Sequence, residues 1–403
     1  MKPACLAYVD DATTLAVGYV QQEKTLKDIS KFAVKHKLEW GEQKCKVMEI
    51  GHHKERKSEW GLGDKIIGNC QNYKYLGEII SRDGKEAENI EEKQEKVIVT
   101  VRKILNCAKS DIMKGIGTKV ILKLHNAVLI PSFYSASETW TLNCGDKKEI
   151  NKIEIVALKK LFGLPPTTPT PAIVFVTGSL YAEIRVEIRQ LLYLHKLLLM
   201  NDDHWAKETL KELSKSSIGW ARKIMETLET WELETDWEII ARKSKAEWKN
   251  EIETRAEKIN QNKLTEDCHV KERGNYKLKS KTKTIIDEIQ HCNYKRKPSD
   301  ILNDLSLLET RAFIMGKYGM LDCGANYAMG YGGKNCQKCG TLDDENHRIN
   351  HCIRFRHINL CDVDEECDFA MTFSNDAKLI RQVITSVLSI WDLGHGKNSI
   401  RGC

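Results

Sequence analysis

The sequence predicts an α+β protein that is mainly α-helical. Short apolar runs bounded by turn residues fill the first 85 residues, which is typical of strands, whereas residues 88–255 repeat apolar side chains at helical spacing. A cluster of cysteine and histidine side chains follows towards the C-terminal end. These changes of pattern divide the chain into four expected parts, at residues 1–87, 88–205, 206–300 and 301–403.

The composition is that of a globular protein inside the cell. Of the 403 residues, 41% are hydrophobic and 30% are charged, and no apolar run approaches the roughly 18 residues of a membrane helix. The chain starts without a signal-peptide pattern, so we expect a location in the nucleus or cytoplasm and no membrane contact. The 14 cysteines mostly stand far apart, which in a reducing compartment indicates buried thiols and one metal site instead of disulfides.

Residues 5–20 predict a β-hairpin. Short apolar runs flank Asp10 and Asp11, so we expect this acidic pair to lie at the hairpin turn. Further along, apolar spacing predicts a helix over residues 26–35, a strand over 47–51, and a strand over 73–80 that ends in a turn at 83–84.

Two adjacent carboxylates at a hairpin tip can bind magnesium. Mg²⁺ prefers a few carboxylate oxygens together with substrate phosphates, and two such ions can stabilise the attacking and leaving oxygens of phosphoryl transfer. Taken alone, Asp10 and Asp11 are explained more simply by a solvated turn, because turns favour Asp for backbone reasons.

The middle of the chain predicts a series of helices with one interruption. Helical periodicity fits residues 88–110, 117–130, 146–162, 181–201 and 204–255. Four of the seven prolines fall in residues 164–171, so this run must break the series. A last apolar helix is expected from about Leu302 through Arg311.

A basic stretch covers residues 242–297. It contains 16 Lys/Arg against 9 Asp/Glu, an excess that accounts for the whole net charge of +6. Such a stretch can follow a phosphate backbone by releasing counterions. A solvated helix face or a linker explains it equally well, since residues 255–300 have few apolar anchors.

The strongest local motif is C-x2-C-x7-H-x4-C, formed by Cys336, Cys339, His347 and Cys352. Two thiolates two residues apart can bind one side of a tetrahedral zinc ion, and His347 and Cys352 can complete it. Such a site would be structural, because catalytic zinc keeps one position open for water. His351 is an alternative fourth ligand, and a chance grouping of buried thiols is the alternative to metal binding altogether.

The order of several motifs resembles the reverse transcriptases of non-LTR retrotransposons, the LINE-like elements. These motifs are YVDD at residues 8–11, WGEQKCKVM at 40–48 and YKYLG at 73–77. Three later segments are also similar to the family, namely SFYSASETW at 132–140, ALKKLFGLP at 157–165 and the C-terminal Cys/His cluster, which resembles a CCHC zinc knuckle. The resemblance covers most of residues 5–360 and is weakest between 205 and 300.

The resemblance implies a truncated palm, a helical thumb, a charged helical connector and a small zinc-knuckle unit in the four parts of the chain. It also implies RNA-templated DNA synthesis with Mg²⁺, with RNA, DNA and dNTPs as ligands. Asp10 and Asp11 match the family's catalytic aspartates. The nucleotide- and primer-binding positions of the family correspond to Tyr8, Lys44, Tyr75, Leu76 and Gly77.

The chain departs from the family in one respect that bears on activity. In the family a first catalytic aspartate lies well before the YVDD motif, whereas nine residues precede Asp10 here. A two-metal site would then lack a ligand. We therefore expect a C-terminal fragment of an RNA-directed DNA polymerase that binds RNA and DNA without polymerising alone. The alternative is a non-enzymatic nucleic-acid-binding protein or a pseudogene product derived from such an element.

Overall fold

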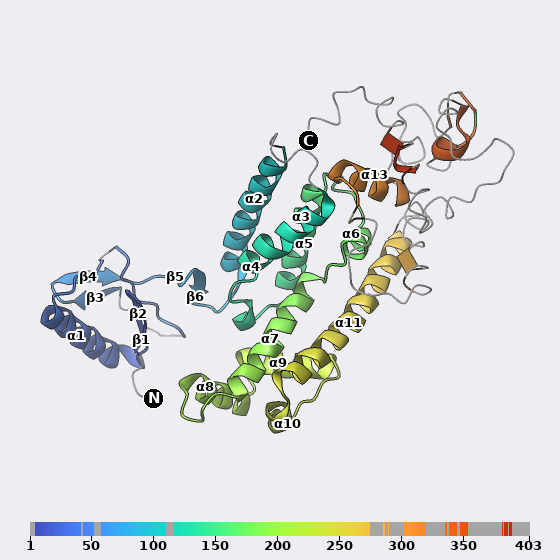
Figure 1. The fold of residues 1–403 in the computed structure, drawn as a ribbon. Helices are drawn as coiled ribbons and strands as arrows, with labels where there is room; N and C mark the ends of the chain where they lie inside the picture. Colours follow the sequence, from blue (N-terminus) through green and yellow to red (C-terminus); the bar gives the residue numbers. More distant parts are fainter. Residues whose placement is uncertain are drawn as a thin grey trace. The chain divides into compact units, whose positions relative to one another are not determined.

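The computed structural model is mainly helical with small antiparallel sheets, as the sequence predicts (Figure 1). It forms two compact units, Met1–Lys93 with Trp140–Asp146, and Gln94–Thr139 with Lys147–Cys403. The palm, thumb and connector implied by the resemblance stay predictions. The structure describes residues 5–41, 43–51, 58–109, 117–274, 285–286, 289, 302, 304–318, 335–336, 338–344, 347–353, 381, 383–385 and 387–388.

In the first unit, helix α1 (Gly18–His36) lies beside small hairpins. Helix α1 packs on β3, and Leu26, Trp60 and the β4 residue Ile67 lie in one small core. The three hairpins pair β1 (Cys5–Tyr8) with β2 (Asp11–Thr14), β3 (Glu59–Leu62) with β4 (Lys65–Gly68), and β5 (Asn72–Tyr75) with β6 (Glu78–Ser81).

The first hairpin is shorter than predicted. Its two-residue turn is Val9 and Asp10, so Asp11 already belongs to β2, and α1 begins at Gly18. Every residue from 5 to 14 is exposed or half-buried. The hairpin therefore projects its acidic pair into solvent.

Two other strand predictions were wrong. The strand expected over residues 73–80 is instead the tight β5–β6 hairpin, because Leu76 and Gly77 have φ angles of 50° and 87° and form its turn. This hairpin agrees with the primer-gripping hairpin that the resemblance implies at residues 75–77. Positive φ at both turn residues matches the twist of two-residue hairpins. The strand expected over 47–51 is reduced to one bridge between Val47 and Asn69, and the β3–β4 hairpin was not predicted.

Helices make up the second unit. Helices α2 (Ala87–Lys109) and α5 (Cys144–Leu161) begin in the first unit and continue in the second. The others are α3 (Thr118–Leu124), which runs through a π-helical turn (His125–Leu129) into α4 (Ile130–Phe133), then α6 (Thr170–Thr177), α7 (Ala182–Leu198), α8 (Trp205–Lys215), α9 (Gly219–Thr230), α10 (Trp237–Arg242), α11 (Lys245–Gly274) and α13 (Leu307–Lys317). Within the part of the chain that the structure describes, no helix has the length and apolar content needed to span a membrane.

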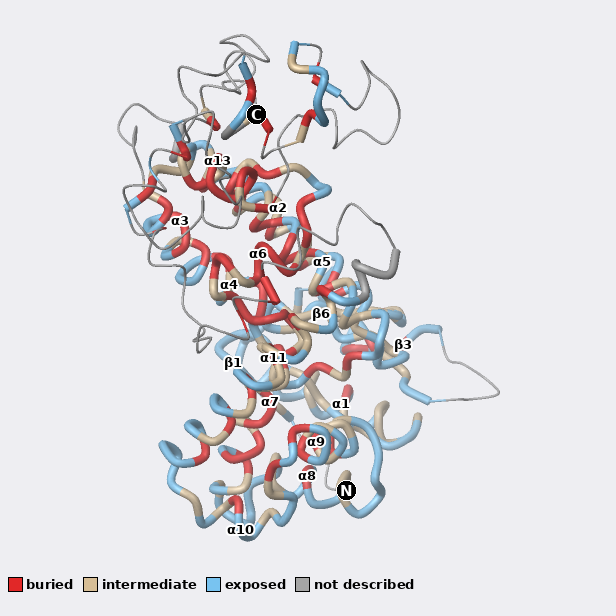
Figure 2. Tube along the Cα trace, turned by 90° about the vertical axis from the view of Figure 1, so that its right-hand side faces the viewer, coloured by how far each residue is buried: buried red, intermediate tan, exposed pale blue. Residues whose placement is uncertain are grey.

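The proline-rich run interrupts the helices, as predicted, but it also contains the start of a helix that was missed. Helix α5 ends at Leu161, and α6 begins at Thr170 with Pro171 in its first turn, where a missing N–H is tolerated. Figure 2 shows α6 as buried along most of its length. This short helix is part of the second unit's core.

Helix α11 corrects the expectation of a connector with few apolar anchors. It has a buried side chain at every fourth position, so these side chains share one face. The stripe consists of Trp248, Ile252, Ala256, Asn260, Leu264 and Cys268. It packs against α6 and α7, which makes α11 an integral part of the helical unit.

The helix predicted over residues 204–255 is broken into four. Ser217 and Glu232 have positive φ angles of 48° and 52°, which end the first two segments, and Asp236 caps α10 by accepting from the Glu238 amide at 2.8 Å. The last apolar helix, expected from about Leu302, begins at Leu307, after a capping box between Ser306 and Glu309.

We expect Trp248→Ala to destabilise the second unit by about 3–5 kcal/mol. The Trp248 side chain is 0% exposed, and its Nε1 donates to the Leu191 carbonyl at 3.0 Å. Trp205→Ala is the matched control, since that indole is 55% exposed, and it should cost less than about 1 kcal/mol. Urea unfolding followed by far-UV circular dichroism measures both. Equal losses would contradict the packing of α11 against α7.

Candidate metal centre

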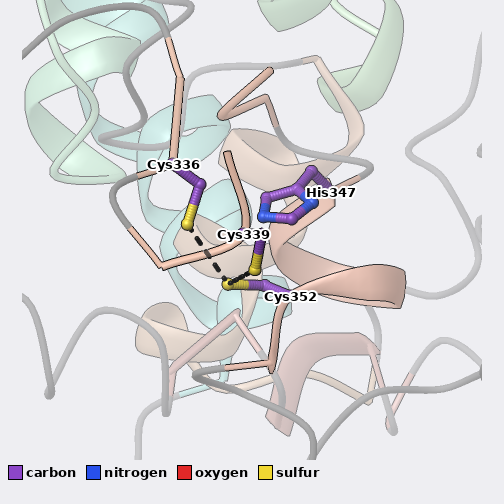
Figure 3. A group of neighbouring side chains, drawn as sticks. All are labelled: Cys336, Cys339, His347 and Cys352. Atoms are coloured by element: carbon purple, nitrogen blue, oxygen red, sulfur yellow. Dashed lines mark hydrogen bonds between the residues drawn. The ribbon is translucent and has the colours of Figure 1, made fainter. Parts of the chain in front are cut away.

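The four predicted ligands lie together (Figure 3). Their ligand atoms all fall within 4.8 Å of one another, and the Cys352 Sγ lies 3.8 Å from the Sγ atoms of both Cys336 and Cys339. Tetrahedral zinc with Zn–S bonds of about 2.3 Å places two sulfurs about 3.8 Å apart, whereas a disulfide requires about 2.05 Å. The spacing of the sulfurs therefore fits a shared metal ion.

A tight turn presents the first two cysteines. The Gly340 amide donates to the Cys336 carbonyl at 2.8 Å, and the Cys336 amide donates to the Thr341 carbonyl at 2.7 Å. Gly340 has a φ of 73°, a conformation that glycine adopts without strain. The Ile353 amide donates to the Cys339 sulfur at 3.4 Å. Backbone N–H groups directed at sulfur stabilise the thiolate form that binds metal.

His347 occupies the start of a π-helical turn, His347–His351. Its backbone amide donates to Asp344 Oδ1 at 2.7 Å, and its Nδ1 lies 3.1 Å from Thr341 Oγ1. Its Nε2 is buried and has no hydrogen-bond partner among the residues that the structure describes. A proton on Nδ1, donated to Thr341, leaves Nε2 with the lone pair that a metal requires. A bound metal would give this buried nitrogen a partner and so remove the free-energy cost of leaving it without one.

The electrostatic surroundings favour a thiolate. Burial raises the pKa of Cys336, but the amides of Lys338 and Cys339, together with His347 and Cys352, outweigh it and lower this pKa to about 6. The thiolate is the metal-binding form of cysteine. Cys336 and Cys352 also belong to the buried core of the second unit, so the cluster is part of that core.

The structure favours Cys352 over His351 as the fourth ligand. Cys352 is 0% exposed and faces the other sulfurs, whereas His351 is exposed. Three supporting residues were missed by the sequence reasoning, namely Thr341, Asp343 and Asp344. Asp343 forms a two-bond pair with Arg348, with both distances at 2.7 Å. A signal was available for Asp344, since Asp three residues before His347 fits a helix cap.

The predicted magnesium ligands lie elsewhere, at the exposed tip of the first hairpin. Asp10 and Asp11 are both exposed, and Val9 beside them is 93% exposed with a φ of 56°. A β-branched residue in this region is strained, as at many functional turns. Among the residues that the structure describes, the Cys/His cluster is the metal-type group of three or more side chains, and the aspartate pair belongs to no such group.

The other predicted residues lie on neighbouring segments of the first unit. Lys44 is exposed, and its carbonyl accepts from the Tyr73 hydroxyl of β5 at 2.9 Å. Burial, and then the nearby Cys45, Asp11 and Cys70, raise the pKa of Tyr73. Tyr73, which the sequence reasoning did not single out, therefore bonds β5 to the Lys44 segment and lies within the electrostatic influence of Asp11.

The β5–β6 hairpin contains three of the predicted nucleotide- and primer-binding residues. Tyr75 is half-buried at the end of β5, and Leu76 is 51% exposed at the turn. A Cβ added at Gly77 would meet open space, so its φ of 87° is the constraint at that position. Tyr8, at the end of β1, is likewise mostly exposed.

Fold and site together define a mainly helical protein with a Cys₃His cluster that can hold a metal ion. Comparison of the chain with known protein families, with curated proteins and with solved structures finds no match in any of the three.

Cys352→Ser should abolish binding of one zinc ion per chain, whereas His351→Ala should retain it, because only the first removes a converging ligand atom. Metal content of the purified full chain, measured by plasma mass spectrometry, gives the answer. Cys107→Ser, which changes an exposed cysteine, is the control. Loss of zinc in His351→Ala with retention in Cys352→Ser would contradict the ligand set.

Proposed function

We propose that this chain is part of an RNA-directed DNA polymerase of the non-LTR retrotransposon type and that it binds RNA and DNA. The order of the motifs supports the proposal, and one structural observation carries it. The YKYLG strand is bonded to the Lys44 segment through Tyr73, whose hydroxyl donates to the Lys44 carbonyl at 2.9 Å, and the Asp11 carboxylate is near enough to help raise the pKa of Tyr73. A polymerase requires these same motifs to lie together.

Two metals have separate roles in this proposal. Asp10 and Asp11 offer exposed carboxylate oxygens, the ligands that Mg²⁺ prefers next to substrate phosphates. The Cys₃His cluster offers three thiolates and an imidazole, a donor set that selects zinc. Zinc bound by four protein ligands would support the fold instead of the chemistry.

The thumb helices offer a surface for nucleic acid. Residues 112–137 contain no Asp or Glu, and Lys119 and Lys123 lie on one exposed face of α3. Neither lysine forms an ion pair with any residue in the described part of the chain. Unpaired lysines in a region free of carboxylates attract phosphate groups.

The basic connector contributes less through its described residues than the sequence suggested. Residues 242–269 contain seven Lys/Arg and six Asp/Glu. Several of these lysines and arginines are paired, including Lys243 with Glu251 at 2.6 Å and Arg255 with Glu232 at 2.8 Å. Most of the basic excess falls on residues 270–297, which lie largely outside the described residues.

We expect Lys119→Gln/Lys123→Gln to lower the affinity for an RNA–DNA duplex about tenfold and to reduce the salt slope by about two. Fluorescence anisotropy across a salt series measures both quantities. Lys215→Gln/Lys223→Gln removes the same charge from lysines already paired with Glu212 and Glu226, so it is the matched control. Equal losses in the two double variants would argue against the α3 face.

Primer extension on an RNA template with Mg²⁺ tests the polymerase part of the proposal. Both carboxylates come from one hairpin, whereas a two-metal centre needs ligands from more than one segment. We therefore expect the purified chain to bind template–primer while incorporation stays near background. Robust incorporation that Asp10→Asn abolishes and Asp28→Asn leaves intact would show a complete catalytic site. Failure to bind any duplex would reject the proposed function.

A further inference from the structure

A buried lysine lies beside the β5–β6 hairpin, whose turn consists of Leu76 and Gly77. Lys93, on helix α2, is 1% exposed, and its ammonium forms an ion pair with Glu78. Glu78 is the first residue of β6, directly after the Leu76–Gly77 turn, and it pairs across the hairpin with Tyr75. Through this ion pair, Lys93 contacts the residue that directly follows the hairpin turn.

A second side chain on the same face of α2, Asn89, also holds this hairpin. Asn89 donates to Glu78 Oε2 at 3.0 Å and to Glu86 Oε2 at 3.3 Å, and it accepts from the Ile79 amide at 3.5 Å. Glu86 accepts from the Thr141 amide at 3.4 Å. Asn89 and Lys93 are four residues apart on one face of α2, so this helix holds the start of β6 through two side chains.

Trp140 also packs against the Lys93 ammonium. The Lys93 ammonium lies 5.8 Å from the centre of the Trp140 ring, and that indole is 2% exposed. The ring adds a cation–π contact on the buried ammonium, whereas the Glu78 side chain stays 19% exposed. Lys93 thus links the hairpin, α2 and Trp140, the last residue of the SFYSASETW motif.

A buried ion pair is not the most stable way to fill this space. Two apolar side chains of similar volume are often as stable or more so, because both charges must be desolvated. The pair instead fixes the orientation of the Glu78 carboxylate, because Lys93 bonds one of its oxygens and Asn89 bonds the other. Directional bonds of this kind fix the orientation of the element that carries them.

We propose that Lys93 is a positioning residue, which through Glu78 fixes the Tyr75–Leu76–Gly77 tip against the 3′-terminal nucleotide of a bound primer strand. The assignment rests on the proposed function. Lys93 itself contacts no nucleic acid, because it is covered by Trp140 and Glu78.

The test compares two ligands of the full chain by fluorescence anisotropy. One is an RNA template with a recessed DNA primer, and the other is a blunt RNA–DNA duplex of the same length. We expect the wild-type protein to prefer the recessed 3′ end, and Lys93→Met to reduce that preference about tenfold, which is the effect of losing one hydrogen-bond-sized interaction at the tip. Lys74→Met is the matched control, because Lys74 also joins this hairpin to α2, through an exposed pair with Glu92.

A purely structural role would lower the affinity for both duplexes alike and would be repaired by an apolar pair. The double variant Lys93→Met/Glu78→Met leaves no buried charge and should fold as stably as the wild type. Loss of the preference in this folded variant supports positioning, and a wild-type preference in it overturns the assignment. Wild-type binding with no preference for the recessed end also overturns it, while leaving nucleic-acid binding intact. Absence of wild-type binding to either duplex would reject the proposed function itself.

Discussion

The packing of α11 along α6 and α7 is the constraint on which the helical unit depends. Asn260 is the polar residue in the buried stripe of α11, and its side chain bonds a backbone amide at the start of α7. Asn260 Oδ1 accepts from the Tyr181 amide at 3.0 Å, and Asn151 accepts from the Ala182 amide at 2.6 Å. The first amides of α7, which have no partner within the helix, are thus satisfied by side chains of α11 and α5. Apolar burial holds the helices together, and these two asparagines set their register.

Much of the helical content could be predicted from the sequence because helical periodicity is local. The predicted ranges for α2, α5 and α7 agree with the structure to within about three residues, which is the usual precision of such boundaries. The α11 stripe was missed because its four-residue repeat is diluted by charged residues between the anchors. The breaks after α8 and α9 were missed because Ser217 and Glu232 have positive φ angles that their residue types do not signal.

The candidate sites also contain residues that could be predicted from the sequence and residues that could not. The metal cluster was predictable because its spacing is a property of one short segment, and each ligand type is rare enough to be noticed. Its supporting groups are common residues whose role appears only in three dimensions, as with Thr341 beside the His347 ring. The Lys93–Glu78 pair was equally hidden, since a lysine in an amphipathic helix ordinarily indicates solvent. Long-range pairing of charged side chains leaves no local pattern in a sequence.

The location of the metal cluster has a consequence for the lifetime of the protein. Cys336 and Cys352 share one buried core with α13 and with the buried residues Val383, Ile384 and Val387. Metal affinity at such a site is part of the folding free energy, so loss of the ion would loosen the C-terminal segments and the helices that they cover. Partly opened chains are the ones that proteases cleave. The supply of metal in the cell would then set how long each copy of this protein survives.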